Sequence, residues 1–335
     1  MRPYFHPRLV NQPQGDPALF IQFLHERRAF LFDLGDISTL SAKDILKLTH
    51  VFISHTHIDH FIGFDYLLRV MLGREKKLCI AGPAGILKNV EGKLAGYSWN
   101  LVENYENNFC IKVSEVGYED IITKEYYCRD SFAQTNETRV SKFDNLIFQS
   151  PLFLVYTMAL DHQIPSLAFR MEEKFHVNIV KEGLARLGLC VGPWIKGLKE
   201  AIHAGKGWDE LFQVVYMQQD GKRLCREFPL GELAKEATQI VPGQKVVYVA
   251  DMRYTSDNIE KAVQLARDAD ILFIESSFLH SEKELAYEKY HLTARQAGLI
   301  ARDAGVKELR IFHFSPRYTG MSELLFQEAH EAFQG

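Results

Sequence analysis

ISHTHIDHF, residues 53–61, places four side chains of the metal-ligand type, His55, His57, Asp59 and His60, within six residues. The stretch follows the apolar run 51–53 and precedes apolar residues at helical spacing, so it predicts a turn between a strand and a helix. Three imidazoles and a carboxylate crowded into a folded turn are costly to desolvate unless a cation binds them. Imidazole nitrogen and carboxylate oxygen suit Zn, Mn or Fe. The stretch therefore predicts a metal site rather than four structural polar residues.

Three further ligand candidates stand at the ends of apolar runs. They are His162 in MALDHQIPS, Asp251 in VYVADMRYT and His313 in IFHFSPRY. Alone, each of them is a weak signal, and a hydrogen-bonded core residue is the more frequent explanation for the two histidines. A pair of catalytic ions takes about seven protein ligands, because positions stay open for water. Together with the turn, the three residues complete such a set.

Composition limits the classes of function. The 335 residues, 47% of them hydrophobic, are enough for a substantial core. A net charge of −4, from 39 basic and 43 acidic residues, argues against broad electrostatic binding of nucleic acid over the whole surface. Five scattered cysteines without a C-x-x-C pair disfavour a disulfide framework or a zinc ribbon. The sequence has no apolar run of membrane-spanning length and no secretory h-region, so a cytoplasmic location is expected.

Strands alternate with helices in the last third of the chain, which predicts a layered α/β architecture. Asp257 is expected to cap one helix, and Thr293 with Gln296 to form a capping box at the start of another. Two strands are expected within 18–36, and antiparallel strands within 91–150. The strands expected in the last third are 245–251, 271–276 and 308–314.

SHTHIDH matches the H-x-H-x-D-H signature of the metallo-β-lactamase superfamily. LDHQIPSLAFR, HLTARQAG and IFHFSPRY, in that order, resemble successive motifs of ribonuclease Z. The resemblance implies one domain over residues 1–335 with the four-layer αβ/βα metallo-β-lactamase fold, and an arm inserted at 176–235. It also implies a metal-dependent phosphodiesterase, an endonuclease that removes 3′ trailers from precursor tRNA.

The resemblance further implies how the ligands divide. One divalent ion is expected on His55, His57 and His162, and a second on Asp59, His60 and His313, with Asp251 bridging both. The ions are expected to be zinc, with Mn or Fe as alternatives, and to activate a water molecule that Asp59 orients or deprotonates. The family's arm usually acts across a homodimer, so a homodimer is expected here.

A general acid is expected to assist the departing sugar oxygen. By resemblance, IESS at 274–277 and HLT at 291–293 correspond to the HEAT and HST motifs of ribonuclease Z, which nominates Glu275 and His291. Ile274 stands where the family has a histidine. The alternative is that Glu275 and His291 are capping residues at a strand end and a helix start.

Substrate contacts are expected on the arm and near the ions. Residues 177–206 resemble the tRNA-gripping arm of ribonuclease Z, with Gly192-Pro193 in place of its Gly-Pro motif. Segment 181–226 has eight basic and five acidic residues, and Lys196 and Lys199 are its candidate phosphate contacts. A solvated surface is the alternative. Arg253 and Arg317 are phosphate-binding candidates or structural ion-pair partners.

Two other functions stay open at this point. The chain begins MRPYFHPRLVNQPQGDP and lacks the Gly-rich FLGTG turn of ribonuclease Z. This departure favours another hydrolase of the superfamily, acting on a small ester, a cyclic nucleotide or another phosphodiester. A binding or scaffolding protein without turnover is the second alternative, and the complete set of seven ligands disfavours it.

Overall fold

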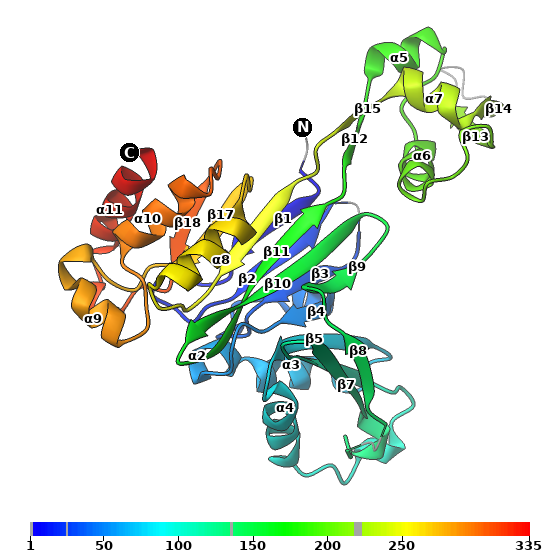
Figure 1. Ribbon diagram of the computed structural model, residues 1–335. Helices are drawn as coiled ribbons and strands as arrows, with labels where there is room; N and C mark the ends of the chain where they lie inside the picture. The colour runs from blue at the N-terminus through cyan, green and yellow to red at the C-terminus, as the bar shows by residue number, and fades with distance from the viewer. Residues whose placement is uncertain (1–2, 25, 135–136, 218–222) are drawn as a thin grey trace. The chain divides into compact units, whose positions relative to one another are not determined.

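The computed structural model describes residues 3–24, 26–134, 137–217 and 223–335 (Figure 1). Within them, one sheet has eight strands in the order β1 (Phe5–Leu9), β2 (Leu19–Phe23), β3 (Ala29–Phe32), β4 (Leu48–Phe52), β5 (Lys77–Pro83), β6 (Cys110–Val116), β7 (Asp120–Tyr127) and β8 (Arg139–Lys142). The second has six in the order β18 (Leu309–Phe312), β17 (Ile271–Glu275), β16 (Lys245–Val249), β11 (Ile164–Glu173), β10 (Phe153–His162) and β9 (Leu146–Gln149). The strands expected within 18–36, within 91–150 and in the last third are confirmed.

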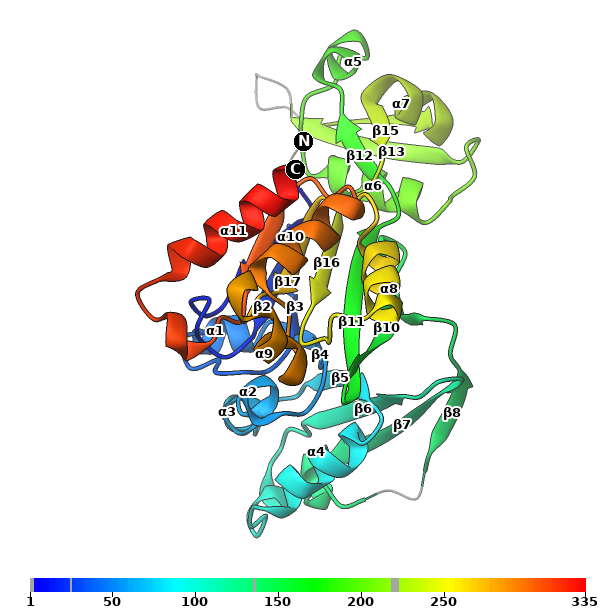
Figure 2. The ribbon, with the colours of Figure 1, turned by 60° about the vertical axis from the view of Figure 1, so that its left-hand side comes forward.

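Helices cover the outer face of each sheet. The eight-stranded sheet packs against α1 (Ala42–Ile45), α3 (Phe64–Met71) and α4 (Ile86–Ala95) through one apolar cluster. The six-stranded sheet packs against α8 (Ser256–Ala266), α10 (Ala294–Asp303) and α11 (Ser322–Gln334) through another. Figure 2 shows α8, α10 and α11 on the same side of the sheet that contains β16 and β17. The short helices are α2 (Ile58–Phe61), α9 (Lys283–Glu288) and four 3₁₀ turns, Val102–Asn104, Cys128–Asp130, His280–Glu282 and Pro316–Tyr318.

Aromatic side chains join the inner faces of the two sheets. In β3, Leu31 belongs to the outer, helix-facing cluster, whereas Phe32 points the other way, because successive side chains of a strand alternate between faces. The ring of Phe32 lies 5.4 Å from that of Phe169 on β11 and 5.9 Å from that of Tyr248 on β16. The order helix, sheet, sheet, helix confirms the expected four-layer αβ/βα fold.

The helix starts were predicted in part. Thr293 and Gln296 form the expected capping box of α10, with side chain to backbone bonds in both directions. The cap expected from Asp257 is wrong. Thr255 caps α8 instead, because its extended backbone lets its hydroxyl accept from the Asn258 N–H at 3.3 Å, whereas Asp257 already lies in the first turn.

Gln149–Leu154 and Glu172–Gln244 form a compact unit with a core of its own. It consists of β12 (His176–Ile179) paired with β15 (Thr238–Val241), β13 (Leu211–Met217) paired with β14 (Arg223–Pro229), and helices α5 (Lys181–Arg186), α6 (Trp194–His203) and α7 (Leu230–Ala237). The arm expected at 176–235 falls inside this unit.

All five cysteines are free, and two of them, Cys190 and Cys225, are exposed. Among the helices of the described residues, none has the length and apolar character that a membrane span requires.

Candidate metal centre

The histidine-rich stretch forms a turn after β4, as predicted. The backbone N–H of Ser54 donates to Asp33 at 2.6 Å, and His57 is the N-cap residue of α2. His55 and His60 are fully buried, whereas His57 is exposed. The turn therefore brings ligand atoms together from two segments, the residues before α2 and the first turn of α2.

The other ligand candidates stand at ends of strands in the second sheet. His162 is the last residue of β10, Asp251 is the second residue after β16, and His313 directly follows β18. The backbone of His313 is left-handed, with φ at 64°. Such a conformation is strained for a residue with a side chain, and it clusters at functional sites. Three more residues around the centre share it, namely Asp33, Gln163 and Tyr290.

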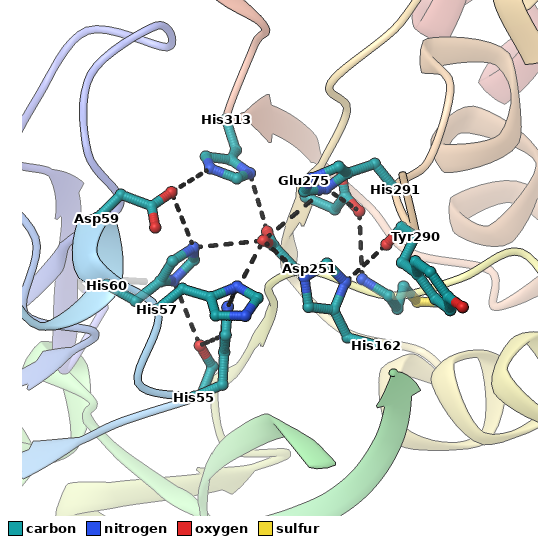
Figure 3. Close-up of polar contacts among 12 residues, drawn as sticks. His55, His57, Asp59, His60, His162, Asp251, Glu275, Tyr290, His291 and His313 are labelled. Carbon is teal, nitrogen blue, oxygen red and sulfur yellow. Dashed lines mark hydrogen bonds and ion pairs between the residues drawn. The ribbon is translucent and has the colours of Figure 1, made fainter. Parts of the chain in front are cut away.

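Asp251 lies at the middle of the cluster (Figure 3). Its Oδ2 is 3.4 Å from His60 Nε2, 3.5 Å from His162 Nε2 and 3.7 Å from His55 Nε2. Its Oδ1 is 2.8 Å from Nδ1 of His313. The carboxylate thus faces imidazoles that come from distant parts of the chain.

The ligand atoms fall into sets that a cation could bridge. Those of His55, His57, His162 and Asp251 all lie within 4.8 Å of one another, and so do those of Asp59, His60 and His313. A third set, Asp251, Glu275, His291 and His313, meets the same limit. The first two sets are the groups that the ribonuclease Z resemblance implies for two ions.

The ring nitrogens that face away from the cluster are held by hydrogen bonds. His60 Nδ1 donates to Asp33 Oδ2 at 2.8 Å, and His162 Nδ1 donates to the Tyr290 carbonyl at 2.7 Å. His55 Nδ1 lies 3.0 Å from the Ser54 hydroxyl. Metal-binding histidines are held in this way, because the outer bond fixes the tautomer and leaves Nε2 as the ligand.

The inward-facing atoms fit a cation. His60 Nε2 is buried without a hydrogen bond among the described residues, and Asp251 Oδ1 and His313 Nδ1, although close, are not aligned for one. Burial lowers the pKa of His55 to about 2, so that ring is a neutral ligand. Burial also opposes protonation of His313, but the Asp251 carboxylate outweighs it and raises the pKa of His313 to about 10. The Asp251 carboxylate thus stabilises positive charge in the cluster, and a divalent ion can replace the proton that it stabilises on His313.

Glu275 and His291 are also brought together. His291 Nδ1 lies 3.3 Å from Glu275 Oε1, which accepts from the Leu292 N–H at 3.0 Å as well. Glu275 Oε2 accepts from the Ser277 hydroxyl at 3.0 Å. Glu275 is fully buried, whereas the His291 side chain is 20% exposed and lines a cavity. Ile274 points into the apolar cluster beneath α8 and α10.

The two arginine candidates differ in their surroundings. Arg253 stacks on Tyr287 and Tyr290, with its guanidinium carbon 3.8 and 4.6 Å from the ring centroids. Arg317 forms an ion pair with Glu282 and lines the same cavity as His291. In this structure, therefore, Arg317 occupies the ion-pair role that the sequence left open, and Arg253 an aromatic one.

The basic candidates of the arm lie on α6. Lys196 is exposed and 3.8 Å from Glu200, whereas Lys199 is half-buried, and burial lowers its pKa. Lys222, counted in the basic segment, lies outside the described residues.

Two buried polar residues of the centre were not expected. Asp33 accepts from Ser54, from His60 and from the Tyr248 hydroxyl. The Asn258 amide donates to the carbonyl of Asp161, next to His162, at 2.9 Å and to that of Arg253, two residues after Asp251, at 2.8 Å. It thereby joins the backbone segments of two proposed ligands. Asp33 stands at the end of an apolar run, LFD, which is a weak signal of the kind that identified Asp251.

Relatives with a shared name match most of the sequence. It is 33% identical over 317 residues to Ribonuclease Z of Lactobacillus gasseri, covering 91% of this chain and 84% of the relative. It is 31% identical over 326 residues to Ribonuclease Z of Geobacillus kaustophilus, covering 94% and 88%. The chain belongs to the ribonuclease Z family. No family model matches the sequence.

Solved structures agree on the fold of this ribonuclease Z family member. The metallo-β-lactamase fold protein YhfI from Bacillus subtilis has a TM-score of 0.55 at 16% identity, covering 98% of this chain and 95% of that one. The short form of human tRNase Z has a TM-score of 0.52 at 18% identity, covering 94% and 92%. The metallo-β-lactamase fold expected from the signature is therefore confirmed.

Proposed function

We propose that the chain is a metal-dependent phosphodiesterase that removes 3′ trailers from precursor tRNA in the cytoplasm. Family membership supports the enzyme class, since the relatives are named ribonucleases. The observation that carries the proposal is the gathering of six ligand-type side chains around a seventh, Asp251. We further propose two divalent ions, expected to be zinc, and a homodimer, which rests on the family resemblance alone.

His55, His57 and His162 would hold one ion, Asp59, His60 and His313 the other, and Asp251 would contact both. When bound, the ions supply positive charge for the phosphate oxygens of the transition state and favour ionisation of water at neutral pH. Asp59 is the residue proposed to orient the attacking water, because its carboxylate is partly exposed and His313 Nε2 holds it at 3.1 Å. It can accept the proton of that water.

His291 is the proposed general acid, and Glu275 the residue that positions it. Glu275 is buried and saturated by donors, so it is poorly placed to reach substrate. His291 reaches the cavity, and Glu275 with Asp251 raises its pKa against the opposing effect of burial. A protonated His291 can then donate to the departing sugar oxygen.

The deciding experiment incubates the purified protein with a precursor tRNA that carries a 3′ trailer, with and without a chelator. We expect trailer release, its loss with chelator and its return on adding zinc. Hydrolysis of bis(p-nitrophenyl) phosphate without action on the tRNA would contradict the proposed substrate. Full activity of protein shown by elemental analysis to be metal-free would contradict the proposed mechanism.

A further inference from the structure

A cavity of about 430 Å³ adjoins Asp59, His291 and His313. This volume lies within the range of small-molecule sites, roughly 300–1,000 Å³. Part of its lining is the loop between β1 and β2, which contributes Gln14 and Asp16, and another part is basic, with Lys289 and Arg317. The lining therefore combines hydrogen-bond acceptors with cations beside the proposed reaction centre.

The loop from β1 to β2 is held in place from several directions. Its position matters because Gln14, Gly15 and Asp16 form one wall of the cavity. The bonds run from Asn11 Nδ2 to the Asp16 carbonyl at 2.7 Å, from the Phe314 N–H to the Pro13 carbonyl at 2.7 Å, from the Gly35 N–H to the Pro17 carbonyl at 3.0 Å, and between Gln14 and Ser322.

Asp16 lies next to the reaction centre without belonging to any metal-ligand set found among the described residues. A Cβ built on Gly35 would be 2.6 Å from Asp16 Cβ and 2.6 Å from the Asp59 carbonyl oxygen, so these two residues flank the same point. A carboxylate here repels phosphate oxygens, but it is a strong acceptor for hydroxyl groups. Lys289, an exposed cation of the same lining, offers the complementary contact to phosphate, whereas Arg317 is paired with Glu282.

We infer that this cavity binds the ribonucleotide next to the scissile phosphodiester, with Asp16 accepting a hydrogen bond from its 2′-hydroxyl. The inference rests on the proposed function and names a residue that selects RNA. The 2′-hydroxyl is the group by which a protein distinguishes RNA from DNA at a given position. Asp16 acts in specificity, and the chemistry stays with the residues around Asp251.

The test uses three precursor tRNAs, one all-ribose, one with a single 2′-deoxy nucleotide 5′ of the cleavage position and one with it 3′ of that position. Wild-type protein is expected to cleave one of the deoxy substrates about tenfold more slowly, because that substrate lacks one hydrogen bond to a charged acceptor. In Asp16→Asn the all-ribose substrate is expected to slow by a smaller factor, and the difference between ribose and deoxyribose to shrink, because a neutral amide oxygen is a weaker acceptor than a carboxylate.

Asp36→Asn is the matched control, because Asp36 is an exposed carboxylate nearby that does not line the cavity. It removes the same charge and should keep the discrimination. Wild-type cleavage that ignores both deoxy positions, or undiminished discrimination in Asp16→Asn, overturns the inference and leaves the proposed function standing. No cleavage of the all-ribose precursor overturns both.

Discussion

Asp33 Oδ2 lies 2.8 Å from Nδ1 of His60, and neither side chain is exposed to solvent. The same carboxylate accepts from the Ser54 N–H, the Ser54 hydroxyl and the Tyr248 hydroxyl. Asp33, directly after β3, thereby connects the histidine-rich turn of the eight-stranded sheet to β16 of the six-stranded sheet. It orients His60 without lining the metal centre itself.

Asp33→Asn is expected to weaken metal binding by about 10- to 100-fold, because outer-shell partners orient the ligand ring. It should also lower the free energy of unfolding by about 1–3 kcal/mol, since buried donors lose their acceptor. A competitive chelator titration and urea unfolding measure the two effects. Tyr248→Phe, which removes one donor and leaves the carboxylate, serves as the control and should keep its metal. Unchanged metal affinity in Asp33→Asn would contradict the orienting role.

His57→Ala is expected to lose one of two bound ions and almost all activity while its thermal unfolding midpoint stays near that of the wild type. The side chain is exposed, and its close polar contact is the 3.0 Å approach of Nδ1 to His55 Nε2, so little packing is lost. Elemental analysis and circular dichroism give the readouts. His330→Ala, an exposed histidine on α11, should change neither. Retention of two ions in His57→Ala counts against this residue as a ligand.

His291→Ala separates acid catalysis from metal function. Cleavage of precursor tRNA should fall about 10²- to 10⁴-fold, because the departing sugar oxygen needs a proton. Hydrolysis of bis(p-nitrophenyl) phosphate should fall far less, because nitrophenolate leaves without one. Metal content is measured in parallel. Equal losses on both substrates would show that His291 acts through the metal centre rather than as an acid.

Removing the arm should spare the chemistry. Ile179 and Thr238 are paired partners of β12 and β15, so residues 180–237 can be replaced by a two-residue Asn-Gly turn. The shortened protein is expected to hydrolyse bis(p-nitrophenyl) phosphate at the wild-type rate and to cleave precursor tRNA with a KM at least tenfold higher, since backbone contacts supply affinity. Loss of both activities in a folded variant contradicts an arm that serves tRNA alone.

Gly35→Ala tests the tight approach beside Asp59. Its new Cβ would come within 2.6 Å of the Asp59 carbonyl oxygen, so the turn must shift, and a loss of about 1–3 kcal/mol in unfolding free energy is expected. Gly92→Ala on α4 is the contrasting control, because open space surrounds its Cβ position. It should gain about 0.5–1 kcal/mol from helix propensity. Urea unfolding measures the stability of both variants. Equal unfolding free energies would contradict a close approach at Gly35.

The sequence predicted the proposed ligands because each of them has a local signal. Four lie in one turn, and the other three, His162, Asp251 and His313, end apolar runs. The partners that hold these ligands lack such a signal. The Tyr290 carbonyl binds His162 through the backbone, which any residue carries, and Asn258 is an ordinary polar residue of an amphipathic helix.

Roles that depend on burial also needed the structure. Glu275 and His291 could each be the acid in the sequence, and their unequal exposure distinguishes them. For the loop at 10–18, the sequence indicated only that the Gly-rich turn of ribonuclease Z is absent. Its placement beside Asp59 follows from long-range bonds to Gly35 and Phe314, which no local pattern predicts.

The strand order has a consequence for biosynthesis. His313 follows β18, the last strand among the described residues, and β18 joins its sheet beside β17. A growing polypeptide therefore lacks a complete second set of proposed ligands until residue 313 has been made. Tight retention of both proposed ions would then mark a molecule in which the ends of β4 and β18 have come together, and products truncated before His313 would release what they capture.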